Sequence, residues 1–340
     1  MRKIKALLGI LLLVALIMAA SGCGPKAIPP TTSEPGEKTI KIAYIPMTYE
    51  TADFYGQYHQ GMVKGLDELG IKYELLVRAP SSTSAHDQQL SIVEDMITAG
   101  VDFIVLAPTS YEGQQAAYRK INESGIPLII ANYSQPFPAD FRATALSFVG
   151  YQHSDGGLAV ANYIKDNYPK GTKMAIIHGT PMYSTFERGA RDHHVVNGMD
   201  VVSEQFADWD RAKAYDTAQR LITAYPDLKI IVATSSHMAI GAVEAIASEG
   251  LTGKIDVFGA GAILEELDHI EKGTLKGSWY RDPIKMGENT AESIWLHLNG
   301  RTNEIPQAYN VPIGMITSVK DIIEQINPIT YTSVGRQFPK

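Results

Sequence analysis

Short apolar runs alternate with longer amphipathic segments along most of this chain, and this alternation limits the folds that it can adopt. The short runs are rich in Ile, Val, Leu and Ala, which is typical of strands that are buried on both faces. Several amphipathic segments end at a glycine, among them Gly70, Gly125 and Gly250, and glycine readily terminates a helix. Strands that alternate with helices in this way predict a parallel, doubly wound sheet.

The same pattern places each expected element. Strands are expected at residues 40–45, 72–77, 101–106, 127–131, 145–150, 174–177, 201–206, 230–233, 255–258, 276–280 and 309–317. Helices are expected at residues 55–69, 84–99, 113–124, 154–167, 185–197, 211–224, 238–249, 264–272, 284–298 and 319–326. These strands are too numerous for one sheet of ordinary size. We therefore expect an α/β protein with two doubly wound parallel-sheet lobes and a cleft between them.

Size and charge narrow the class further. A chain of 340 residues with 45% hydrophobic and 20% charged residues is an ordinary globular protein of two domains. Its formal net charge is −7, and without residues 1–22, which carry three basic residues and no acid, it becomes −10. An acidic chain offers no broad basic face, so nucleic acid is not an expected partner.

The first 23 residues have the pattern of a bacterial lipoprotein signal peptide. Basic residues near the N-terminus precede an apolar stretch at residues 6–20, which is short for a membrane span. The sequence Ala20-Ser21-Gly22-Cys23 then resembles a lipobox, and Cys23 is the only cysteine. We expect Cys23 to carry the lipid that holds the protein at the membrane; the alternative is an uncleaved signal anchor. Residues 24–38, rich in Pro, Ser and Thr, are expected to form an extended tether.

The segment from Met174 to Gly189 is a candidate binding segment. An apolar strand leads into a Gly-Thr-Pro loop, and a helix follows that begins near Ser184 or Thr185. Loops at the carboxyl ends of strands form the ligand sites of open α/β sheets. Arg188 in this segment offers a planar guanidinium suited to a carboxylate, a borate or paired hydroxyls. A surface ion pair is the alternative role for this arginine.

Several short motifs together resemble a known family. They are Asp53-Phe54-Tyr55, Gly125-Ile126-Pro127 leading into Asn132, Glu187-Arg188-Gly189, His237-Met238-Ala239-Ile240-Gly241-Ala242 and Phe258-Gly259. In this order and spacing, over residues 39–317, the chain resembles the type I periplasmic binding proteins of the ribose-binding class. Behind a lipobox, it resembles a substrate-binding lipoprotein.

The resemblance implies discontinuous lobes that close around a ligand like a hinge. Three segments would cross between the lobes, near residues 148–151, 280–283 and 309–312. The N-terminal lobe would then contain residues 39–147 plus 283–308, and the C-terminal lobe residues 148–282 plus 309–340.

The resemblance also implies ligand-binding roles for individual residues. Aromatic side chains would stack on a sugar ring, and amide, guanidinium, hydroxyl and imidazole groups would bind its hydroxyls. The residues at these positions are Phe54, Tyr55, Asn132, Arg188, Ser235, Ser236, His237 and Arg281. The alternatives are a core role for the two aromatics, a turn-forming role for Asn132 and an ion pair of Arg281 with Asp282. The acid that the family places after the Phe-Gly turn is replaced by Ala260.

A narrower resemblance concerns the autoinducer-2 receptor branch of the family. Asn132, Arg188 and Arg281 resemble its site, in which two arginines face an anionic borate diester, and residues 148–153 and 266–270 also resemble it. Ala260 and His237 differ from the tryptophan and the acid of that branch. An identical ligand is therefore not implied.

Together these features predict a receptor and not an enzyme. We expect a lipid-anchored, extracytoplasmic cell-envelope protein that binds a sugar or polyol-like ligand, with dense hydroxyls or some anionic character, for an ABC permease. The alternative is a signal receptor that works with a membrane sensor kinase. We expect a monomer without catalytic residues, cofactor or metal, because no Gly-x-Ser-x-Gly, His-Glu-x-x-His or P-loop motif is present.

Overall fold

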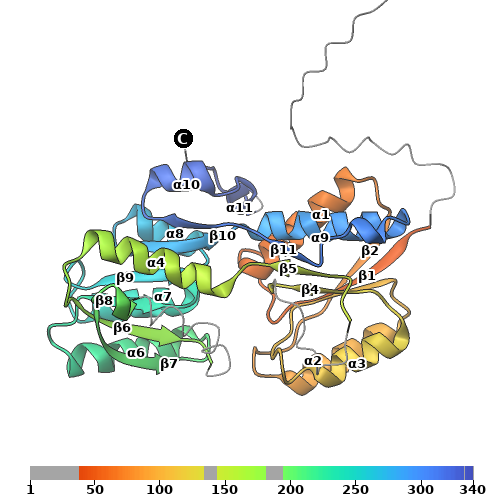
Figure 1. Cartoon of the computed structure of the whole chain (residues 1–340). Helices are drawn as coiled ribbons and strands as arrows, with labels where there is room; N and C mark the ends of the chain where they lie inside the picture. The colour runs from red at the N-terminus through yellow and green to blue at the C-terminus, as the bar shows by residue number, and fades with distance from the viewer. Residues whose placement is uncertain (1–37, 134–143, 181–193, 333, 340) are drawn as a thin grey trace, which may run out of the picture. The chain divides into compact units, whose positions relative to one another are not determined.

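The computed structural model describes residues 38–133, 144–180, 194–332 and 334–339. The predicted signal peptide with Cys23, nearly all of the predicted tether and the candidate Arg188 lie outside these residues. The described residues contain two six-stranded sheets, each with helices packed against it (Figure 1). The predicted class, two α/β lobes, is therefore confirmed.

The first sheet is parallel throughout. Its strands lie in the order β11 (Ala308–Asn310), β5 (Ser147–Gly150), β4 (Leu128–Ala131), β3 (Phe103–Leu106), β1 (Ile40–Ile45) and β2 (Tyr73–Val77). Helices α1 (Phe54–Glu68) and α9 (Pro283–Leu298) cover one face, and α2 (His86–Thr98) and α3 (Gln115–Ser124) cover the other (Figure 1). The central strands β3 and β4 are fully buried, as their unbroken apolar sequences predict.

The second sheet is mixed. Its strands lie in the order β12 (Ile313–Ile316), β10 (Gly277–Arg281), β9 (Asp256–Ala260), β8 (Ile230–Ala233), β6 (Lys173–His178) and β7 (Asp200–Phe206). The edge strand β12 runs antiparallel to β10, whereas the other pairs are parallel as predicted. The described helices of this lobe include α4 (His153–Asn167), α6 (Arg211–Ala224), α7 (Ser236–Ser248), α8 (Leu264–Glu271) and α10 (Val319–Gln325).

One predicted strand was wrong. Residues 309–317 do not form a single strand but contribute to two strands, β11 in the first sheet and β12 in the second. Pro312 lies between them and has no N–H group to donate to a sheet. The N–H of Val311 still donates to the carbonyl of Gly150 at 2.9 Å, after which the chain leaves the first sheet. Two short elements were also not predicted, η2 (Thr302–Glu304) and α11 (Ile329–Thr332).

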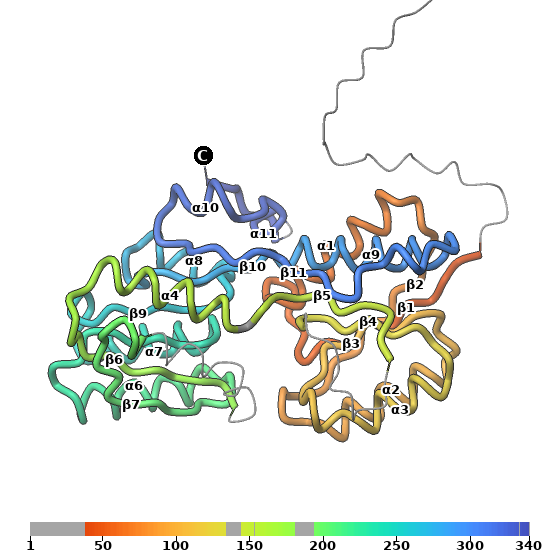
Figure 2. Tube along the Cα trace, viewed as in Figure 1, coloured from red at the N-terminus to blue at the C-terminus, as the bar shows by residue number. Residues whose placement is uncertain are grey.

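The chain passes between the two sheets at three places, which can be followed along the trace in Figure 2. They lie between β5 and α4, between β10 and α9, and between β11 and β12. Residues 148–150 and 309–310 hydrogen-bond within the first sheet. The exact division of the chain into lobes stays a prediction.

Helices α1 and α9 come from distant parts of the chain and pack closely in the first lobe. A Cβ atom at Gly61 would lie 2.0 Å from the carbonyl oxygen of Ile284, and one at Gly287 would lie 2.2 Å from that of Tyr58. The hydroxyls of Tyr58 and Thr290, 2.5 Å apart, join the same two helices. The two glycines therefore allow a backbone approach that no larger residue would permit.

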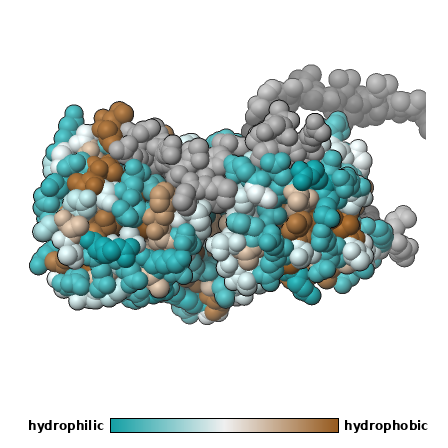
Figure 3. All heavy atoms as spheres, turned by 90° about the horizontal axis from the view of Figure 1, so that it is seen from below, coloured by the Kyte–Doolittle hydropathy of each residue, from teal (hydrophilic) through white to brown (hydrophobic). Residues whose placement is uncertain are grey.

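The face of the molecule that Figure 3 presents is mainly hydrophilic. Figure 3 shows small hydrophobic groups scattered over both lobes on the face that it presents. The exposed large hydrophobic side chains belong to both lobes and are those of Leu158, Val195, Val196, Phe206, Leu298, Val319 and Ile323. Among the described residues, no helix has the length and apolar character needed to span a bilayer.

Candidate functional site

A pocket lies where the carboxyl ends of strands from both sheets face each other. It encloses about 1230 Å³ of empty space, open solvent included. This is the position at which open α/β sheets place their ligands. Its lining comprises Met47, Thr48, Asp53, Phe54, Tyr55, Thr83, Asn132, Tyr151, Gly157, Val160, Ile176, His194, Trp209, Val232, Thr234, Ser235, Ser236, His237, Ala260, Gly261, Ile263, Trp279 and Arg281. Seven of the eight predicted ligand-binding residues are among them; Arg188 lies outside the described residues.

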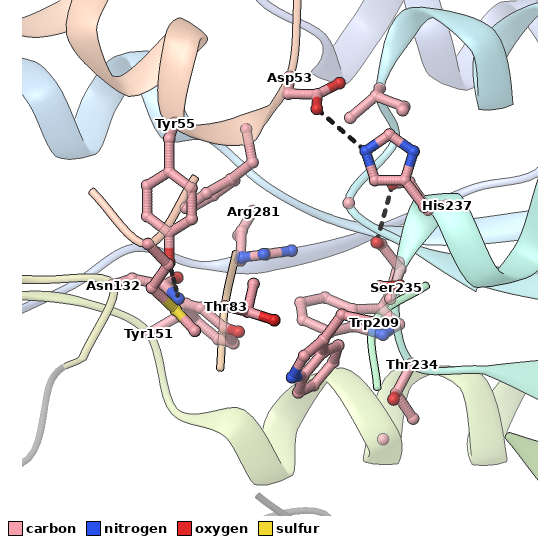
Figure 4. A pocket seen from close by; sticks show the side chains of 18 of the residues that line it. Asp53, Tyr55, Thr83, Asn132, Tyr151, Trp209, Thr234, Ser235, His237 and Arg281 are labelled. Carbon is pink, nitrogen blue, oxygen red and sulfur yellow. Dashed lines mark hydrogen bonds and ion pairs between the residues drawn. The ribbon is translucent and has the colours of Figure 1, made fainter. Parts of the chain in front are cut away.

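Arg281 lies at the carboxyl end of β10 and enters the pocket among aromatic rings (Figure 4). Its guanidinium carbon is 4.1 Å from the ring centroid of Phe54, 4.7 Å from that of Tyr151 and 4.8 Å from that of Trp279. Each such contact attracts the cation by about 0.5–2 kcal/mol, depending on how far it is desolvated. The rings thus fix the plane of the guanidinium without using its N–H donors.

Those donors are free to bind a ligand. The Nε and Nη1 atoms of Arg281 are buried and have no hydrogen-bond partner. The ion pair of Arg281 with Asp282 is not formed among the described residues. Asp282 instead caps α9, where its Oδ1 accepts from the N–H groups of Ile284 at 2.9 Å and Lys285 at 3.1 Å. A buried, unpaired guanidinium donor costs free energy, which a ligand with acceptor oxygens would recover.

Asn132 lies in a turn, and its side chain lines the pocket. Its backbone has φ 68°, a left-handed conformation that Asn tolerates better than most residues, at the turn after β4. Its side chain lines the pocket, where Nδ2 donates to the hydroxyl of Tyr55 at 3.2 Å (Figure 4). The buried Oδ1 of Asn132 has no hydrogen-bond partner. It therefore offers an acceptor in the pocket that Arg281 also lines.

His237 and Asp53 join the two lobes across the pocket. The imidazole Nε2 lies 2.9 Å from Oδ2 of Asp53, which directly precedes α1 (Figure 4). The hydrogen bond to Asp53 raises the pKa of His237 above its usual value, and burial only partly opposes this rise. The carboxylate of Asp53 is thus paired with His237. Among the described residues that line the pocket, no other carboxylate is present to pair with Arg281.

The two serines before His237 have local partners. Ser235 is the N-cap of α7, where its Oγ accepts from the N–H of Met238. The Oγ of Ser236 lies 2.6 Å from Oε2 of Glu266 and 3.0 Å from the carbonyl oxygen of Ala260. Both serines line the pocket, but these bonds give each of them a structural role.

Glu266 is a buried carboxyl beneath this part of the pocket. Besides Ser236, the Oγ of Ser278 lies 3.1 Å from its Oε2. Burial raises the pKa of Glu266, while the two serine hydroxyls lower it. The carboxyl thus fixes the serine at the start of α7 to the neighbouring strand β10. Glu266 was not among the ligand-binding residues predicted from the sequence.

Three large aromatic residues of the pocket were also missed by the sequence analysis. Trp279 lies two residues before Arg281 on β10, so strand alternation places both side chains on one face and could have indicated it. Trp279 is also the direct neighbour of Ala260 across β9 and β10. Tyr151 directly follows β5. Trp209 lies in a loop with φ 61°, and no sequence pattern indicated its position.

The loop that carries Trp209 packs closely against the end of β6. A Cβ atom at Gly179 would lie 2.0 Å from the indole ring of Trp209. The N–H of Asp208 donates to the carbonyl of Gly179 at 2.8 Å. The glycine therefore makes room for the tryptophan at the pocket. Among the residues with described positions, no cluster of three or more His, Cys, Asp or Glu side chains could hold a metal ion.

Comparison with known proteins gives a consistent result. Residues 42–302 match the family described as periplasmic binding protein domain. The ribose import binding protein RbsB of Bacillus subtilis is 27% identical over 315 residues, which cover 92% of this chain and 99% of that protein. A solute-binding protein from Actinobacillus succinogenes, solved with bound D-allose, is 25% identical with a TM-score of 0.73, covering 82% of this chain and 98% of the other.

A further solved structure supports the fold alone. It is a solute-binding protein from Agrobacterium vitis with bound D-fucose, 21% identical with a TM-score of 0.76, and the match covers 84% of this chain and 97% of that chain. The family match extends from β1 into η2 and thus includes strands of both sheets. This chain belongs to the periplasmic binding protein family.

Proposed function

We propose that this protein is the extracytoplasmic substrate-binding component of an ABC importer and binds a sugar or sugar-like molecule by closure of its two lobes. The observation that carries the proposal is the pocket between the lobes, in which the unpaired donors of Arg281 lie among three aromatic rings. Aromatic faces bind the C–H surface of a sugar, and a planar guanidinium binds paired oxygens. The similarity to ribose- and allose-binding proteins supports this assignment.

The ligand that we propose carries an anionic group. Arg281 has no carboxylate partner among the described lining residues, and Asp53 is paired with His237. Arg188, predicted from the sequence to be a second arginine of the site, would add another positive charge. A ligand with a carboxylate or similar group would neutralise this positive charge. A neutral sugar could only accept hydrogen bonds from the guanidinium through its hydroxyls.

A thermal-shift screen tests both parts of the proposal. The chain from residue 24 onward is unfolded and refolded to remove any copurified ligand. It is then tested with ribose, allose and myo-inositol, and with the matched pair D-galactose and D-galacturonate. The panel also contains the autoinducer-2 precursor with and without borate. A ligand at 100 times its Kd adds about 2.7 kcal/mol of stability. We expect a melting shift with sugars, and the larger shift with the anionic member of the pair.

The alternative outcomes are distinct. A shift with neutral sugars alone would retain the import function and remove the anionic ligand. A shift that requires the autoinducer-2 precursor together with borate would favour the signal receptor that works with a membrane sensor kinase. No shift with any compound would contradict the proposed ligand class.

We further propose that the protein is anchored to the membrane by a lipid on Cys23, followed by the tether at residues 24–38, and that it acts as a monomer. The lipobox-like sequence and the lack of another cysteine support this. Cys23→Ala should abolish incorporation of labelled palmitate into the protein. Incorporation of the label into the variant would contradict the lipid on Cys23.

A further inference from the structure

The C-terminal segment after β12 is fixed to the second lobe. Arg336 donates to both carboxylate oxygens of Asp268, which belongs to α8, at 3.1 and 2.6 Å. The hydroxyl of Tyr331 donates to Glu271 of the same helix at 3.4 Å. Tyr331 is 1% exposed and belongs to the hydrophobic core of the second lobe. The short helix α11 is therefore held in a defined place on α8.

From this position α11 reaches the first lobe. The hydroxyl of Thr330 donates to Oε1 of Gln57, on the first turn of α1, at 3.0 Å. Both side chains are buried, with 1% and 2% exposure. The bond joins residues that are 273 positions apart in the sequence. It is thus a polar contact between the lobes in addition to the three chain crossings, and buried hydrogen bonds of this kind are costly to break.

Gln57 also binds the loop before α1. Its Nε2 donates to the carbonyl of Ala52 at 3.1 Å. The loop also folds closely over α1, since a Cβ atom at Gly56 would lie 2.2 Å from the carbonyl oxygen of Glu50. Ala52 directly precedes two residues that line the pocket, Asp53 at the N-cap of α1 and Phe54 at its first position.

Those two residues make the contacts that shape the pocket. Asp53 meets His237 at 2.9 Å, and the ring of Phe54 lies 4.1 Å from the guanidinium carbon of Arg281 (Figure 4). Both contacts cross from the first lobe to the second. A small displacement of the loop at residues 50–53 would therefore weaken both.

We propose that Thr330 and Gln57 are positioning residues, which hold the loop at residues 50–53 so that Asp53 meets His237 and Phe54 covers Arg281. This role rests on the proposed function, because it matters for ligand binding only if the pocket is the binding site. Neither residue lines the pocket itself. The C-terminal helix thereby sets the geometry of a site formed by residues far from it in sequence.

The titration of His237, followed by NMR in the ligand-free protein, tests the proposal. The charged groups that act on His237 are Asp53 at the start of α1 and Glu265 and Glu266 on α8. The Asp53→Asn variant serves as a reference, because its His237 titrates without the charge of Asp53 beside it. We expect Thr330→Val to lower the pKa of His237 part of the way to its value in Asp53→Asn. Thr330→Ser, which keeps the hydroxyl, should retain the wild-type pKa.

Two further variants keep the test decisive. Thr332→Val changes an exposed threonine of the same short helix and should leave the pKa of His237 unchanged. Gln57→Leu removes the hydrogen bonds of Gln57 to Thr330 and Ala52 and should lower the pKa of His237 as Thr330→Val does. It replaces the threonine variant if that variant does not fold. A Thr330→Val or Gln57→Leu protein that melts lower but titrates like the wild type would overturn the proposal, because the residue would then be only structural. Since no ligand is added, this outcome is independent of whether the pocket binds a sugar.

Discussion

The imidazole Nε2 of His237 and the carboxylate Oδ2 of Asp53 lie 2.9 Å apart, and this contact joins the first turn of α7 in the second lobe to the start of α1 in the first. The side chain of His237 is 45% exposed and that of Asp53 is 22% exposed. The pair is therefore accessible to water at the mouth of a pocket formed by both lobes. Its strength depends on the charge of the imidazole, which changes near neutral pH.

We predict that this contact stabilises the protein mainly at mildly acidic pH. The pKa of His237 is raised above 6.5 in the folded state, so the stabilisation is complete below 6.5 and is lost as the pH rises through the raised value. Asp53→Asn should lower the melting temperature by no more than a few degrees near pH 6, because solvent screens the pair. The difference from wild type should shrink toward pH 9. A difference in melting temperature that grows with pH would contradict this interpretation. His237→Gln should show the same dependence of the melting temperature on pH as Asp53→Asn.

Arg281 should be sensitive even to a conservative change. Lysine keeps the charge but loses the planar group that lies between the rings of Phe54 and Tyr151 and offers two donors. Losing one matched hydrogen bond, at about 1–3 kcal/mol, should weaken ligand binding by about fivefold to 150-fold. Calorimetric titration with the compound found in the screen measures this. Arg301→Lys is the matched control, because Arg301 lies over Trp295 at 5.2 Å, away from the pocket.

Arg188 is predicted from the sequence to contribute to the same site. Arg188→Ala should abolish most ligand affinity while the melting temperature of the ligand-free protein stays near that of the wild type. Arg220→Ala, on α6 and outside the pocket lining, serves as the control in the same titration. Comparable affinity in the Arg188 variant would remove this residue from the proposed site.

Glu266 should make the stability of the second lobe fall as the pH rises above 4.5. Its pKa is raised above 4.5 by burial, so the folded state binds the proton more tightly than the unfolded state. Its contribution to stability therefore falls as the pH rises from 4.5 through the raised value. Glu266→Gln removes this dependence and keeps an acceptor for Ser236 and Ser278. We expect the variant to gain stability relative to wild type between pH 5 and pH 8 in urea denaturation.

The neighbouring helix position provides the control for that comparison. Glu265 pairs with Arg211 near the surface, and Glu265→Gln should not reproduce the gain. If the free energies of unfolding of Glu266→Gln and wild type differed by the same amount at pH 5 and pH 8, the carboxyl of Glu266 would not titrate in the folded state over this range.

Gly179 should control the position of Trp209. The added Cβ of Gly179→Ala would lie 2.0 Å from the indole ring, so the ring or the backbone must move, at a cost of roughly 1–3 kcal/mol. We expect a red-shifted tryptophan emission, greater quenching by acrylamide and a loss of ligand affinity. Trp209→Leu should cause the same loss of affinity without the steric clash. An unchanged emission spectrum in Gly179→Ala would show that the space at Trp209 is larger than the contact implies.

Local sequence patterns predicted much of the fold. The strand at residues 230–233 and the helix at residues 211–224 match β8 and α6 at both ends. Asp210 caps that helix by accepting from the N–H of Lys213 at 2.8 Å, a signal that needs only nearby residues. The strand at residues 309–317 failed because its two halves pair with different sheets. Pairing across sheets depends on distant residues, and the local apolar pattern contains no information about it.

The site could be predicted only in part, for a similar reason. The resemblance located Phe54, Tyr55 and Arg281, which all line the pocket. It could not show that Ser236 is bonded to Glu266, 30 positions further along the chain. It also missed Trp209, whose place depends on the fit of its ring against Gly179. The binding roles of the predicted residues stay predictions until a ligand is measured.

The close crossing of α1 and α9 has a consequence for the order in which the lobes can fold. The strands β6 to β10 of the second sheet lie in one continuous stretch, residues 173–281. The first lobe, in contrast, needs α9 and β11 and so lacks a helix and an edge strand until residue 310 has emerged. In a chain that emerges from its N-terminus, the first lobe thus begins first but stays incomplete while strands β6 to β10 of the second lobe emerge. Until α9 with Gly287 has emerged, the face of α1 that carries Gly61 has no packing partner. This uncovered face could then take part in misfolding or aggregation.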